Sequence, residues 1–94
     1  MSERYKCRLV GFALDDHGGH EVMIERTVTL PVFPFSGLEL NGLSGNGQTQ
    51  ITRVVFSVQD QEIECDVLFV VRGEEEDEML SWMKNDYGWL EVKI

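Results

Sequence analysis

The sequence predicts a small α+β domain, with one mainly antiparallel sheet or partly open barrel of about five strands and one helix before the last strand. Three observations lead to this fold class. Residues 50–72 alternate between apolar and polar side chains, residues 74–84 carry a helical apolar stripe, and residues 89–94 alternate again. The expected order is β-β-β-β-α-β, and a chain of 94 residues makes a single domain over 1–94.

The clearest alternation predicts a β-hairpin around a turn at 59–61. Its apolar residues are even-numbered in the first strand and odd-numbered in the second. Both sets share one face only if the loop has an even number of residues. We therefore expect Val58 to pair with Ile63, and Phe56 to pair with Cys65 on the core face. Because Phe56 would then be a buried aromatic side chain, we expect Phe56→Ala to lower the free energy of unfolding by about 3–5 kcal/mol.

The second face of this hairpin changes character along its length. Acidic side chains lie near the turn, whereas apolar ones lie further from it. The face is therefore solvated at one end and covered at the other, by a helix or by a second copy of the chain. The acidic residues are Glu62, Glu64 and Asp66, and the apolar ones are Val55, Leu68 and Val70.

The first strand, 4–14, changes the parity of its apolar residues at Val10 and Gly11. Either a β-bulge at the glycine returns both apolar sets to one face, or the strand is buried on both faces there. With the bulge, the hairpin to the next strand needs an odd loop, which places Asp16 opposite His20.

The returning strand, 21–32, contains an arginine at an inward-facing position. Arg26 lies among aliphatic residues, so it needs a carboxylate partner or a place at the rim. A structural ion pair is the first interpretation, and a ligand-binding arginine is the alternative.

Residues 31–49 predict an extended segment, ending in a short strand around 38–40 and followed by a glycine-rich loop. The helix expected at 74–84 begins with five acidic residues, which suit the positive end of its dipole. Its apolar stripe runs to Tyr87, and Gly88 is placed to end it in a left-handed conformation. The last strand, 89–94, then re-enters the sheet.

The formal net charge is −9, and most of it belongs to the second half of the chain. Residues 54–94 hold three basic and eleven acidic residues, a net charge of −8. Such a chain repels phosphate, so we expect no nucleic-acid ligand. We also expect no membrane segment and no secretion signal, which makes a cytoplasmic location the default.

Residues with catalytic or metal-binding chemistry are few. Asp16, His17 and His20 gather at one turn, but the turn is glycine-flexible and short of an ordered fourth ligand, so they are weak metal candidates. Cys7 and Cys65 lie at apolar strand positions and are expected to be reduced core residues. We expect no cofactor and no enzymatic activity.

Two functions remain. The first is a non-catalytic protein-interaction module that forms a homodimer, using exposed apolar and aromatic residues. The second is an acidic inhibitor, immunity-type or nucleic-acid-mimic protein that binds a basic protein partner. The residues expected to contact a partner are Glu62, Glu64, Asp66, Val55, Leu68, Val70, Trp82 and Trp89, and the wider aromatic strip adds Phe33, Phe35 and Tyr87.

Overall fold

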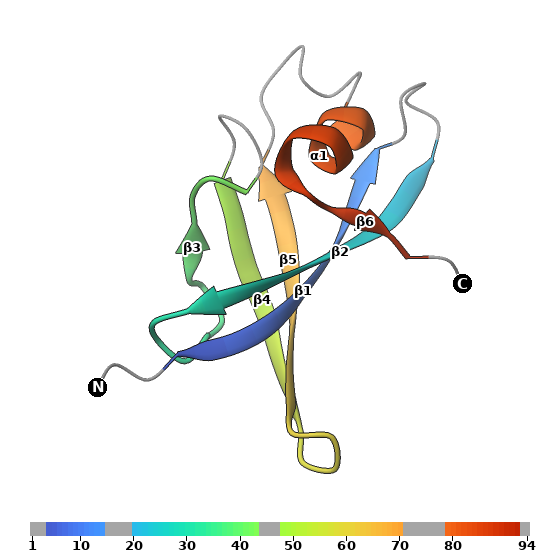
Figure 1. Ribbon diagram of the computed structural model, residues 1–94. Coiled ribbons are helices and arrows are strands. Elements are labelled where there is room, and N and C mark those ends of the chain that lie inside the picture. The colour runs from blue at the N-terminus through green and yellow to red at the C-terminus, as the bar shows by residue number, and fades with distance from the viewer. Residues whose placement is uncertain (1–3, 15–19, 44–47, 71–78, 93–94) are drawn as a thin grey trace.

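The computed structural model describes residues 4–14, 20–43, 48–70 and 79–92. Within them the chain forms six strands and one helix (Figure 1). The elements are β1 (Tyr5–Leu14), β2 (Glu21–Leu30), β3 (Glu39–Leu40), β4 (Gln48–Ser57), β5 (Glu62–Val70), α1 (Met79–Tyr87) and β6 (Leu90–Glu91).

The six strands form one open sheet in the order β3-β4-β5-β1-β2-β6. The predicted α+β class and the helix before the last strand are confirmed, whereas the barrel alternative is not. The sheet is mixed, because β1 pairs in parallel with β5 over four residues, from Cys7 opposite Ile63 to Val10 opposite Asp66. The short strand expected around 38–40 is β3, which raises the strand count to six.

The β4–β5 hairpin has the predicted face parity, but its pairing differs by two residues. Phe56 pairs with Ile63, and Val54 takes the place opposite Cys65. Ser57 pairs with Glu62, so the loop runs over residues 58–61. The Ser57 hydroxyl accepts a hydrogen bond from the Asp60 amide at 3.4 Å, which favours the earlier turn.

The bulge lies in β4 and not in β1. The β4–β5 register shifts between Ile51 and Arg53, so Thr49 and Ile51 face the core below the shift and Val54 faces it above. By contrast, β1 pairs with β2 without interruption, down to Leu14 opposite Glu21. This register is incompatible with Asp16 opposite His20, and Asp16 itself lies outside the described residues.

Gly11 serves a close approach between strands. A Cβ atom at this position would lie 2.5 Å from Cε2 of Phe69 and 2.9 Å from Cγ2 of Val67. The correct alternative is therefore a strand buried on both faces, since Leu9 and Val10 are both buried. Only glycine lets β1 cross over the Phe69 ring.

The core lies on the face of the sheet that α1 covers, which we call the core face. Met83 of the helix and Trp89 after it are buried against β1, β2, β4 and β5. The indole Nε1 of Trp89 donates a 2.8 Å hydrogen bond to the Leu43 carbonyl, and its ring meets that of Phe69 edge-on at 5.0 Å. No helix in the described part of the chain is long and apolar enough to cross a membrane.

The C-terminal helix and strand agree in part with the prediction from the sequence. Gly88 has a φ of 71° and ends α1 as predicted, and the Trp89 amide then bonds to the Met83 carbonyl. The acidic residues expected in the first helical turns lie outside the described residues. In β6 the alternation is reversed from the expectation, because Trp89 is buried and Leu90 is exposed.

The contact at Gly11 makes a first prediction. We expect Gly11→Ala to lower the free energy of unfolding by about 1–3 kcal/mol, because the new methyl group overlaps the packed Phe69 ring. In a Phe69→Leu background, which removes the overlapping ring atoms, the same change should cost less. Urea unfolding of the four proteins measures this coupling, and equal costs in both backgrounds would contradict the contact.

The observed hairpin register changes the expectation for Phe56, which is 50% exposed. We expect Phe56→Ala to cost only about 1–1.5 kcal/mol, because half of the side chain is already in water. Ile51→Ala, at a fully buried position of the same strand, should cost about 2–5 kcal/mol. Chemical denaturation of both variants checks the ranking, and a reversed order would return Phe56 to the core.

Candidate interaction surface

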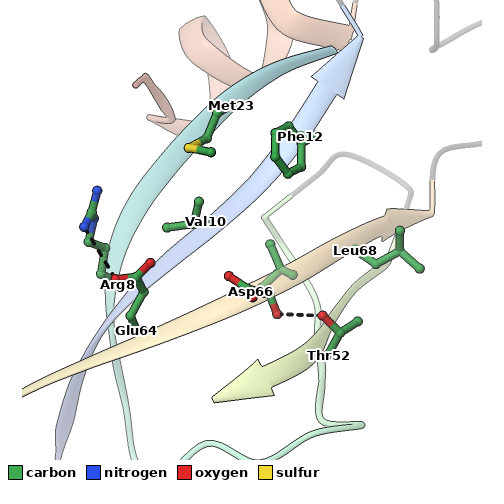
Figure 2. A pocket seen from close by; sticks show the side chains of 9 residues that line it. Arg8, Val10, Phe12, Met23, Thr52, Glu64, Asp66 and Leu68 are labelled. Atoms are coloured by element: carbon green, nitrogen blue, oxygen red, sulfur yellow. Dashed lines mark hydrogen bonds and ion pairs between the residues drawn. The ribbon is translucent and has the colours of Figure 1, made fainter. Parts of the chain in front are cut away.

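The face of the sheet opposite α1, which we call the outer face, carries a groove of about 400 Å³. The groove lies between β1 and β5, with Thr52 of β4 and Met23 of β2 at its sides (Figure 2). Its lining is mostly apolar at one end and charged at the other. The lining residues are Arg8, Val10, Phe12, Met23, Thr52, Glu64, Asp66, Val67 and Leu68.

The groove exists because β1 and β5 part. Their parallel pairing ends at Val10 and Asp66, and Gly11 then carries β1 over Phe69. Beyond that point, Phe12 and Leu68 stand on the two diverging strands with the groove between them (Figure 2). Both side chains are more than half exposed, at 53% and 55%. Two large apolar side chains thus stay in water at the mouth of an apolar groove.

The charged end of the groove is organised by Arg8. This residue occupies the outer face of β1, between β2 and β5, and its guanidinium donates a hydrogen bond to the Glu25 carboxylate. On the other side its Nη1 atom lies 3.7 Å from Oε2 of Glu64. Because all three side chains are partly exposed, each pair adds only about 0.2–1 kcal/mol to stability. The ion pairs therefore mainly hold the Arg8, Glu25 and Glu64 side chains in place, and they add little to the stability of the fold.

The acidic row predicted on β5 lies on the outer face, with cations beside it. Glu64 is paired with Arg8 across the parallel ladder, and Asp66 is paired with Arg53 of β4. Glu62 lies near Lys6, which lines a second hollow beside the hairpin. The row is therefore part of a mixed-charge surface. The second acidic group, 74–78, lies outside the described residues.

The other residues expected to contact a partner are separated by the fold. Val55 lies on the outer face of β4 and is 42% exposed, and Val70 ends β5 opposite Gln48. Trp82 is half-buried, with its ring 5.7 Å from that of Tyr87. Trp89 is buried in the core, so it belongs to no exposed surface.

The sequence analysis missed the β1 and β2 side of the groove. The bulge considered at Val10 and Gly11 would turn Val10 and Phe12 of β1 toward the core face. An uninterrupted alternation through β1 would have placed both β1 residues opposite the core face. Phe33 and Phe35, from the aromatic strip, are exposed on the segment after β2, away from the groove.

Only one of the three weak metal candidates lies in the described part of the chain. Asp16 and His17 lie outside the described residues, and His20 is exposed before β2. No group of three potential ligands occurs in 4–14, 20–43, 48–70 and 79–92. Arg26 is half-buried opposite Leu9, and no carboxylate in these ranges lies within ion-pair distance of it.

The two cysteines are free and fully buried on neighbouring strands. Cys65 pairs with Leu9, two residues along β1 from Cys7, and the Cys7 thiol donates a 3.5 Å hydrogen bond to the Tyr5 carbonyl. Burial, with a smaller contribution from the neighbouring Cys7, raises the pKa of Cys65 to about 12. Burial likewise raises the pKa of Cys7. Both thiols are therefore protonated at neutral pH and poor nucleophiles.

The raised thiol pKa predicts a loss of stability at alkaline pH. An unfolded thiol ionises above its ordinary pKa of 9.0, whereas folded Cys65 stays protonated to about 12. The stabilisation is complete below pH 9 and falls as pH rises, with a slope of up to about 1.4 kcal/mol per pH unit for each thiol. Urea unfolding between pH 8 and 11 should show a steeper fall in the wild type than in a Cys7→Ala/Cys65→Ala variant. Parallel slopes would contradict it.

The chain matches no protein-family model, and neither a curated protein nor a solved structure is significantly similar to it.

Proposed function

We propose that the chain is a non-catalytic protein-interaction module that self-associates as a homodimer and presents the outer face of its sheet to protein partners. The observation that carries this proposal is the groove on the outer face, which leaves Phe12 and Leu68 in water on the side away from α1. Exposed apolar surface of this kind, rimmed by charged residues, is typical of binding surfaces.

The energetics favour a protein as the ligand of this face. Complete burial of a side chain such as Phe12 or Leu68 contributes about 1.5–3 kcal/mol. The groove is open and its apolar end continues into the Arg8 cluster, so a partner meets an apolar patch with charged residues beside it. That is the usual anatomy of a protein–protein interface.

The proposal assigns no chemistry to the thiols. Cys7 and Cys65 are buried and protonated, and they face the core and not the groove. Of the charged residues that line the groove, Arg8 and Glu64 form an ion pair with each other. These features support binding as the role of the surface.

The acidic-inhibitor function remains the alternative, and the net charge of −9 is what favours it. On the outer face, however, Glu62, Glu64 and Asp66 are interleaved with Lys6, Arg8 and Arg53. This mixture weakens the field that would steer a basic partner. A mixed-charge rim suits a partner that also carries both signs.

The two functions predict different salt dependence and different sensitive residues. We expect a Phe12→Ser/Leu68→Ser variant to lose most of the proteins that the wild type captures from a cell lysate, at both low and high salt. Val32→Ser, which alters a half-exposed residue on the segment after β2, should retain them. Quantitative mass spectrometry of the captured proteins measures the difference, and thermal unfolding checks that each variant is folded.

The acidic alternative has the opposite signature. In that case high salt would abolish capture, and so would a Glu62→Gln/Glu64→Gln/Asp66→Asn variant, whereas the groove variant would still capture its partners. This result would identify the acidic row, and not the groove, as the binding surface. Identical protein sets for all variants would remove the outer face as a binding surface.

A further inference from the structure

The free backbone edge of β4 is the most open hydrogen-bonding surface in the described structure. Near its start, β4 is covered: the Ile51 amide bonds to the Leu38 carbonyl at 2.9 Å, and the Gly37 amide bonds to the Ile51 carbonyl at 2.7 Å. The Thr52 carbonyl accepts a bond from the Ser36 hydroxyl at 3.0 Å. From Arg53 to Ser57, no described residue pairs with β4 on that side.

The ladder fixes which backbone groups point outward. Ile51 directs its amide and carbonyl away from β5, so its pair with Val67 is of the non-hydrogen-bonded kind. Non-hydrogen-bonded pairs recur at every second residue of β5, so the pairs Val54 with Cys65 and Phe56 with Ile63 are also of this kind. Val54 and Phe56 therefore present free N–H and C=O groups to the open edge.

This edge differs from the rest of the chain in charge. Between Glu39 and Asp60 the sequence contains no acidic residue, and Arg53 is its one charged side chain. Two copies that each carry a net charge of −9 repel one another, and this edge adds no acidic side chain of its own to that repulsion. The exposed side chains of residues 53–57 are Arg53 and the apolar Val55 and Phe56.

The edge also lacks the features that usually protect edge strands. Neither proline nor lysine occurs in residues 53–57, and the bulge lies at the end that the 36–38 segment already covers. The edge of β2 is better protected, because β6 covers Ile24 and Glu25, and the exposed Thr27 and Thr29 leave it polar. Pro31 then ends that strand.

We propose that a second copy of the chain pairs at this edge, β4 against β4 in antiparallel orientation around a two-fold axis at Val55. The proposal rests on the self-association in the proposed function and names its contact. Val54 then lies opposite Phe56 of the second copy and exchanges both backbone hydrogen bonds with it. Val55 meets its own equivalent on the axis.

The side chains are compatible with this arrangement on both faces. On the core face each β-branched Val54 meets an aromatic Phe56, which is a favourable cross-strand pair. On the outer face Arg53 lies opposite the small Ser57 of the second copy, whose neighbour on β5 is Glu62. Arginine therefore extends toward a carboxylate, and no like charges are opposed.

The test uses the self-contact of residue 55. Sedimentation velocity from low to high micromolar concentration should show a dimer for the wild type. Val55→Lys and Val55→Glu should each raise the dissociation constant by about tenfold or more, because like charges then meet on the axis. An equimolar mixture of the two variants should recover the dimer. Leu68→Lys, on the outer face away from the edge, should leave it unchanged.

The outcomes separate this inference from the proposed function. A wild type that is monomeric throughout would overturn the edge contact and the self-association together, and would leave the outer-face capture experiment standing. A dimer that Leu68→Lys dissociates, or that both residue-55 variants retain, would overturn the edge contact alone. Thermal unfolding of each variant confirms that the half-exposed position 55 tolerates the change.

Discussion

The crossing of β1 over Phe69 is the contact on which the rest of the structure depends. At Gly11 the Phe69 ring lies so close to the backbone of β1 that no side chain fits, and this ring is held edge-on against Trp89. Trp89 in turn donates to the Leu43 carbonyl, which ties the segment after the helix to the loop after β3. One glycine thus allows a core in which strands, helix end and loop share a single aromatic cluster.

The same crossing shapes the opposite face. Because β1 must rise over the ring, its pairing with β5 stops at Val10, and the two strands diverge. Side chains on the outer face that would be cross-strand neighbours in a regular ladder, such as Phe12 and Leu68, are separated by the groove. Core packing on one face and an open apolar groove on the other are therefore two consequences of one close approach.

Local patterns predicted the elements well, and long-range geometry was the part that failed. The period of 50–72 identified β4 and β5 with the correct face parity, and Gly88 marked the end of α1 correctly. The parallel pairing of β1 with β5 was invisible because no strand–helix–strand pattern connects them. Gly11 left two alternatives open for a related reason: a glycine that breaks parity looks the same in sequence whether it bulges or passes over a ring.

The same limit decided the candidate site. Val55 and Leu68 were placed on the second face by alternation alone, and both are exposed there. Phe12 was not, since its assignment depended on the bulge. Trp89 follows a helix and precedes a strand, and nothing in its spacing shows that its indole reaches Leu43. Exposure of an aromatic side chain is set by distant contacts, which the sequence pattern does not contain.

The uneven distribution of charge along the chain relates the open edge of β4 to the groove on the outer face. Acidic residues flank the 40–59 segment at both ends, and this segment contains β4. A charge-poor strand at an open sheet edge tends to pair with the edge strand of another chain. The acidic and mixed-charge residues elsewhere keep the other surfaces of two copies apart, but they do not protect this edge. Pairing at that edge would leave both outer faces uncovered and join them into one longer surface, with Val55 at its centre. The surrounding acidic residues would then limit association to the one edge that carries no acidic side chain. In this way a strongly acidic chain could form a specific dimer and leave the groove on its outer face open.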